Sequence, residues 1–88
     1  MKKVFDNSIK RFVKTAVAMA EKATTMQDLE RLYNSGRKYQ QFIGERMGTG
    51  FYSQQRYAEM WELASLLGTI NSTVESHIDR VRQLEKVA

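Results

Sequence analysis

Apolar residues recur along this chain every three or four positions, which is the spacing that keeps them on one face of an α-helix. The first series comprises Phe5, Ile9, Phe12, Ala16, Met19 and Ala23, widened by Val13, Val17 and Ala20. At about 100° per residue, Lys3, Lys10 and Lys14 fall on the opposite side of the same helix. Residues 3–23 are therefore predicted to form a basic amphipathic helix that turns its apolar face toward a core.

A second series begins after Thr25, a favourable N-cap residue that is followed three positions later by the acidic Asp28. Its apolar face comprises Met26, Leu29, Tyr33, Ile43 and Met47, with Leu32 and Tyr39 at the edge. The tripeptide NSG at 34–36 is a turn signal, yet the apolar series stays in phase across it. A break would have no reason to preserve that phase. We therefore expect a continuous helix over 26–46, in which Gly36 permits close packing.

The third series starts at Ser53, another favourable N-cap residue, after a loop at 48–50. Its apolar face covers nearly half of the helix circumference and comprises Tyr57, Met60, Leu63, Ala64, Leu67, Ile70, Val74, Ile78, Val81 and Leu84. Such a width suits a helix packed against two others, or against one other and a partner subunit. Asn71 lies within this face, where a polar residue can fix the register of a helix pair.

Two interpretations of residues 53–86 stay open. Gly68 can end one helix, and Ser72 with Glu75 forms a capping box that can begin another. Alternatively, one unbroken helix about 50 Å long covers the segment. The pattern thus predicts an all-α single domain over 1–88, built as a small helical bundle. The bundle has three helices with a long last one, or four shorter helices at roughly 3–23, 26–46, 53–67 and 72–86.

Composition removes several kinds of chemistry. The chain has no cysteine, which excludes disulfides, thiolate metal sites and thiol nucleophiles. The single histidine, His77, lies near the edge of the apolar face, and the Glu-x-x-His pairs of a helical di-metal site do not occur. We expect no catalytic residues, no metal and no cofactor, and therefore a protein that is not an enzyme.

Residues 46–61 combine aromatic rings, arginines and glycines at a helix junction. The stretch lacks the preceding strand and the Lys-Ser/Thr pair of a phosphate-binding loop. We expect chiefly a connecting turn in which Phe51 and Tyr52 pack onto the end of the bundle. The alternative is a protein-binding surface, because aromatic and arginine side chains are enriched at binding hot spots. Its members would be Arg46, Phe51, Tyr52, Arg56, Tyr57 and Trp61.

The whole excess of positive charge, a net +4, lies in residues 1–24. A basic helix face there is either solvated surface or a contact for phosphate. The residues for phosphate or nucleic-acid contact would be Lys3, Lys10, Arg11 and Lys14, together with Arg37 and Lys38. The chain shows no convincing helix-turn-helix pattern.

The longest apolar run, AVAMA at 16–20, is far shorter than the roughly 20 residues that cross a bilayer. The first residues also lack the apolar block of a signal peptide. Together with the absence of cysteine, these features favour a soluble, cytoplasmic protein.

The heptapeptide TMQDLER at 25–31 resembles the T-x-x-x-L-E-R helix opening of the Hha family of small nucleoid modulators. The resemblance ends there, since residues 32–52 have no counterpart of similar length in that family, and it carries no function across. In size and composition the chain is also similar to small accessory proteins of bacteriophages and mobile elements. Many of those proteins bind and inhibit host proteins, an analogy at the level of a class.

These observations predict a non-catalytic helical protein that binds and modulates another macromolecule, expected to be a protein, in the manner of a viral inhibitor. We also expect a homo-oligomer. The alternative function is a nucleic-acid-binding module that uses the basic first helix. A further alternative is a protein that sequesters a small ligand such as a nucleotide at a subunit interface near Arg46, Tyr52 and Arg56.

Overall fold

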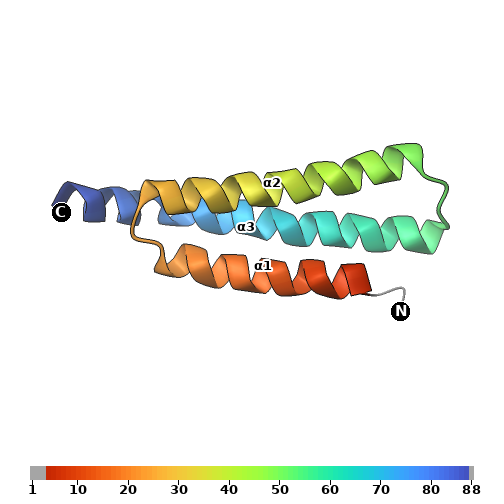
Figure 1. Ribbon diagram of the computed structural model, residues 1–88, viewed down its shortest axis with the longest axis horizontal. Coiled ribbons are helices and arrows are strands. Elements are labelled where there is room, and N and C mark those ends of the chain that lie inside the picture. Colours follow the sequence, from red (N-terminus) through yellow and green to blue (C-terminus); the bar gives the residue numbers. More distant parts are fainter. Residues whose placement is uncertain (1–3, 88) are drawn as a thin grey trace.

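The computed structural model describes residues 4–87, which form three helices joined by two short connections. They are α1 (Val4–Lys22), α2 (Met26–Thr49) and α3 (Gln54–Val87). In Figure 1 the long α3 runs along the middle of the molecule, with α2 on one side and α1 on the other. The prediction of an all-α bundle with a long last helix is confirmed, and of the two open arrangements the three-helix one is correct.

Helix α2 is continuous through the NSG tripeptide, as its unbroken apolar phase predicts. Thr25 caps its start, since the Thr25 hydroxyl oxygen accepts a hydrogen bond from the Asp28 amide at 3.1 Å. Gly36 is buried against α3, and a Cβ there would lie 3.1 Å from Oδ1 of Asn71. The glycine therefore lets the two helix backbones approach closely, which confirms its predicted role. The helix ends at Thr49, three residues later than predicted.

Helix α3 begins after Ser53, whose hydroxyl oxygen accepts the Arg56 amide at 3.1 Å. The alternative of a helix end at Gly68 and a new start at Ser72 is wrong, because the Ser72 hydroxyl donates to the Gly68 carbonyl inside one helix. The physical reason is that the buried positions of α3 stay in phase on both sides of Gly68. An interruption would have displaced one half of that face from the core.

The core lies where α3 meets both of the other helices. It is built from apolar side chains of all three helices and of the α1–α2 connection: Ile9, Val13, Ala16, Ala20, Ala23, Leu29, Leu32, Ile43, Met60, Leu63, Leu67, Ile70, Val74 and Val81. The wide apolar face of α3 thus finds its two neighbours within one chain. The exception is Leu84 near the end of α3, which is 43% exposed. The homo-oligomer stays a prediction.

A polar pair lies in the seam between α2 and α3. The Gln40 side-chain amide donates to the Ala64 carbonyl at 3.0 Å, and the Asn71 amide donates to Gln40 Oε1 at 3.3 Å. Oδ1 of Asn71 is buried and has no hydrogen-bond partner among residues 4–87. Sliding α3 against α2 would break the Gln40–Asn71 contact, so the pair favours one register of these two helices.

The last turns of α3 form hydrogen bonds with the C-terminal end of α1 and with the N-terminal end of α2. The Arg80 guanidinium donates to the carbonyls of Ala20 and Glu21, at 3.2 and 3.1 Å, in the last turn of α1. The Glu85 carboxylate accepts the amide of Met26 at the start of α2. Positive charge thus meets the negative end of one helix dipole, and negative charge meets the positive end of the other. These contacts give the last turns of α3 a structural role.

Candidate functional site

The connection between α2 and α3 is a compact turn at the end of the bundle. The ring of Tyr52 packs edge-on against Tyr57, with centroids 5.5 Å apart, and the Tyr57 hydroxyl donates to the Gly50 carbonyl at 2.8 Å. A Cβ at Gly50 would lie only 2.2 Å from the Tyr52 ring. The expectation of a packed turn is therefore confirmed for Tyr52. It is wrong for Phe51, which is fully exposed because the turn points its ring away from the bundle.

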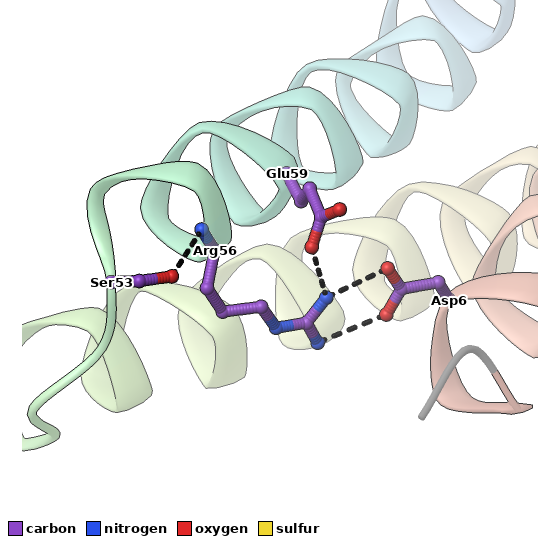
Figure 2. Close-up of polar contacts among 4 residues, drawn as sticks. All are labelled: Asp6, Ser53, Arg56 and Glu59. Carbon is purple, nitrogen blue, oxygen red and sulfur yellow. Dashed lines mark hydrogen bonds and ion pairs between the residues drawn. The ribbon is translucent and has the colours of Figure 1, made fainter. Parts of the chain in front are cut away.

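Arg56 links the first turn of α3 to the first turn of α1. Figure 2 shows its guanidinium reaching Asp6 through two parallel contacts, of 2.7 and 3.0 Å, and Glu59 through a third of 3.2 Å. Asp6 is 3% exposed, whereas 28% of the Arg56 side chain remains accessible. The hydrogen bond to Asp6 raises the pKa of Arg56 further above its usual range, against the opposing effect of burial. Arg56 is therefore a permanently charged structural clamp.

One feature of the sequence indicates this ion pair: a charged residue, Asp6, occupies a position of the apolar face of α1. Asp6 is in phase with Ile9 and Val13 on the buried face of α1. A carboxylate at a core position needs a cationic or hydrogen-bonding partner. The pattern alone did not indicate that the partner would be Arg56, fifty positions away.

Helices α1 and α2 meet through aromatic rings. Phe5 lies against Phe42 with centroids 6.1 Å apart, and Phe12 lies against Tyr39 at 4.9 Å. The Arg46 guanidinium lies over the Phe42 ring at 5.1 Å. We call the surface formed by this row and its continuation the α1–α2 face; it comprises Phe5, Phe12 and Met19 of α1 and Leu32, Tyr39 and Phe42 of α2.

A hollow lies at each end of the α1–α2 face. The first, of about 300 Å³, is lined by Phe5, Phe42, Arg46, Tyr52, Arg56 and Met60. The second, of about 350 Å³, is lined by Met19, Lys22, Ala23, Asp28, Arg31 and Leu32. The Phe12–Tyr39 pair lies between them along the two helices. The face is therefore an apolar strip with a depression at either end.

The structure brings three of the six predicted protein-binding residues together and places the other three elsewhere. Arg46, Tyr52 and Arg56 converge on the first hollow, and they do so within one chain. Trp61 is two-thirds exposed and lies about 140° around α3 from Arg56, beside a separate shallow hollow. The Tyr57 hydroxyl is hydrogen-bonded within the α2–α3 turn, and the Phe51 side chain is fully exposed to solvent.

Sequence reasoning missed most of the α1–α2 face. It assigned Phe5, Phe12 and Met19 to the core stripe of the first helix and placed Tyr39 at an edge. Among these, Phe5 is 38% exposed, Tyr39 40% and Met19 55%. A usable signal exists in the seven-residue spacing of Phe5, Phe12 and Met19, which is offset from the series that meets α3.

The basic candidates do not form one patch. Those that the structure describes are all exposed: Lys10, Arg11, Lys14, Arg37 and Lys38. Lys10 and Lys14 each lie about 160° around α1 from Phe12, which contacts α2. Arg37 lies about 160° around α2 from Tyr39, and its guanidinium approaches the ring of Tyr33. Lys10 and Lys14 therefore point away from Arg37, and Lys3 lies outside the described residues.

Metal-ligating side chains do not form a cluster among the residues that the structure describes. Over residues 4–87 no three histidine or carboxylate side chains lie close enough to hold a metal ion. His77 accepts a hydrogen bond from Arg80 Nε at 3.1 Å through its Nδ1. None of the helices over the same range is both long and apolar enough to cross a bilayer. The chain matches no protein-family model, no curated protein and no solved structure.

Proposed function

We propose that this chain is a non-catalytic binding protein that contacts and modulates another protein through its α1–α2 face. The observation that carries the proposal is a row of large apolar side chains that the fold leaves near 40% exposed, including Phe5, Tyr39 and Phe42. They share one surface and end in two hollows. Contiguous exposed apolar surface of this kind is typical of a protein contact. Aromatic and arginine side chains, here with Arg46 beside Phe42, are the types enriched at binding hot spots.

The geometry favours a protein over a nucleic acid. Single strands bind by stacking bases on open aromatic faces along a basic groove. Here the rings pack against each other at interplanar angles of 47° and 60°, which leaves no flat platform. Lys10 and Lys14 of α1 point away from this face, about 160° around the helix from Phe12. For a small phosphorylated ligand, the first hollow offers Arg46 alone, because the Arg56 guanidinium is already engaged by Asp6 and Glu59.

The test begins by capturing a partner on the immobilised full chain and purifying it. Its affinity is then measured for the wild type and for Phe42→Ala, with Trp61→Ala as the matched control, since both residues are exposed aromatics on different faces. A hot-spot residue contributes 2 kcal/mol or more, so Phe42→Ala should weaken binding by about thirtyfold. Trp61→Ala should change it less than about twofold. Circular dichroism checks that both variants are folded.

Two results would contradict the proposal. Loss of binding in Trp61→Ala with full binding in Phe42→Ala would move the contact to the outer face of α3. A captured partner that nuclease removes, and whose affinity falls steeply with salt, would identify a nucleic acid. A Lys10→Ala/Lys14→Ala variant would then show whether α1 carries that contact.

A further inference from the structure

We propose that the occupant of the α1–α2 face is an acidic amphipathic α-helix of about 15 to 18 residues, contributed by the partner protein. This inference rests on the proposed function and names the partner's chemistry. The helix would lie along α1 and α2 on the side away from α3, as the fourth helix of a four-helix bundle. Three features of the structure support it: a second heptad seam, the spacing of the hollows, and the charge at the margins.

Both α1 and α2 carry a second seam beside the one that meets α3. On α1, alternate steps of three and four residues select Phe5, Ser8, Phe12, Thr15, Met19 and Lys22. On α2 the same steps select Asp28, Leu32, Ser35, Tyr39, Phe42 and Arg46. Large apolar side chains mark the strip. On α1 they alternate with Ser8 and Thr15, and on α2 Ser35 lies between Leu32 and Tyr39. This spacing is the one by which helices interlock side by side, with knobs entering holes.

The two hollows are separated by a distance that one helix can span. Phe5 and Met19 are 14 positions apart, or about 21 Å along α1, and Leu32 and Phe42 are 10 positions apart, or about 15 Å along α2. In a partner helix, side chains at i and i+11 or i+14 share one face and lie about 16 to 21 Å apart. Each hollow of 300 to 350 Å³ has room for a large apolar side chain. A residue near i+7 would then rest on the Phe12–Tyr39 pair.

The charges at the margins select an acidic partner. Lys22 and Arg31 line the second hollow and Arg46 lines the first, and none of the three has an ion pair among residues 4–87. Asp28 is the one acidic residue lining either hollow over that range. A helix that places Asp or Glu beside its apolar stripe would pair with these cations. A second copy of this chain docked through the same face would instead bring the basic margins together.

The test uses two synthetic 18-residue peptides that share leucines at i, i+4, i+7, i+11 and i+14. One carries glutamates at the flanking positions and the other carries lysines. Each is titrated into the isotope-labelled full chain at physiological salt, and amide shifts and affinity are recorded. We expect the acidic peptide to bind at least about tenfold more tightly than the basic one. Its shifts should follow Phe12, Tyr39 and Phe42, and Phe42→Ala should weaken it while Trp61→Ala does not.

Several outcomes would overturn this inference. They are equal binding of the two peptides, no binding of the acidic peptide at millimolar concentration, shifts confined to the surface around Trp61, and displacement of the peptide by single-stranded DNA. If the acidic peptide fails while a captured protein still depends on Phe42, the binding proposal stands and only the acidic helix is wrong. If Phe42→Ala also leaves the affinity for the captured protein unchanged, both proposals fail.

Discussion

The Asp6–Arg56 clamp gives the sharpest stability prediction. Removing one member of a buried ion pair destabilises a protein by about 3 to 5 kcal/mol, whereas exposed pairs contribute about 0 to 1. Asp6 is buried, but the Arg56 side chain is 28% exposed, so water can partly replace the lost contact. We therefore expect Arg56→Ala to lower the free energy of unfolding by about 2 to 3 kcal/mol. At about 4 to 8 °C per kcal/mol, the melting temperature should fall by about 10 to 20 °C.

The assay is a double-mutant cycle of Asp6→Ala and Arg56→Ala, followed by urea unfolding with circular dichroism at 25 °C. The two changes should couple by about 2 kcal/mol, because both remove the same two hydrogen bonds. Arg82→Ala is the matched control, since Arg82 is an exposed arginine of the same helix. If Arg56→Ala is too unstable to measure, Arg56→Lys keeps the charge without the paired geometry and should lose part of the stability. A coupling energy below about 0.5 kcal/mol would refute the clamp.

Four further changes test the packing by thermal unfolding and hydrogen exchange. Gly50→Ala places a Cβ 2.2 Å from the Tyr52 ring and should destabilise the fold by about 1 to 3 kcal/mol; an unchanged melting temperature would contradict the packed turn. Gly44→Ala meets nothing within 4 Å and should gain about 0.8 to 1 kcal/mol from helix propensity. Gly36→Ala should gain less, because its Cβ would lie 3.1 Å from a buried amide oxygen of α3, and equal gains would argue against the close approach. Arg80→Ala should cost about 1 kcal/mol and speed amide exchange in the last turn of α1, and unchanged exchange would remove its capping role.

Local chemistry accounts for the parts of the fold that could be predicted. Thr25 and Ser53 begin helices because a hydroxyl oxygen can accept an amide three residues on, and both do so here. The continuity of α2 through Gly36 followed from the phase of its apolar residues. At Gly68 the same phase argument was set against a glycine and a capping-box pattern. Only the packing of α3 along its whole length resolved that conflict in favour of one helix.

The candidate site was less predictable, because it depends on how the helices are rotated against one another. A stripe of apolar residues says that a helix has a buried side, but its outer members can face the core or the surface. Phe5 and Met19 belong to such a stripe and are partly exposed. Conversely, the charged Asp6 is buried because the first turn of α3 brings Arg56 to it.

The amino-acid sequence by itself determined the helical class, the helix starts, the wide buried face of α3 and the lack of thiol chemistry. These follow from residue identity and from neighbours within a turn or two of the chain. Tertiary structure alone decided that Arg46, Tyr52 and Arg56 meet Phe5 and Phe42 in one hollow. It also decided that Lys10 and Lys14 of α1 point away from Arg37 of α2. Contacts between residues tens of positions apart depend on helix rotation and register, which only the packing of all three helices sets.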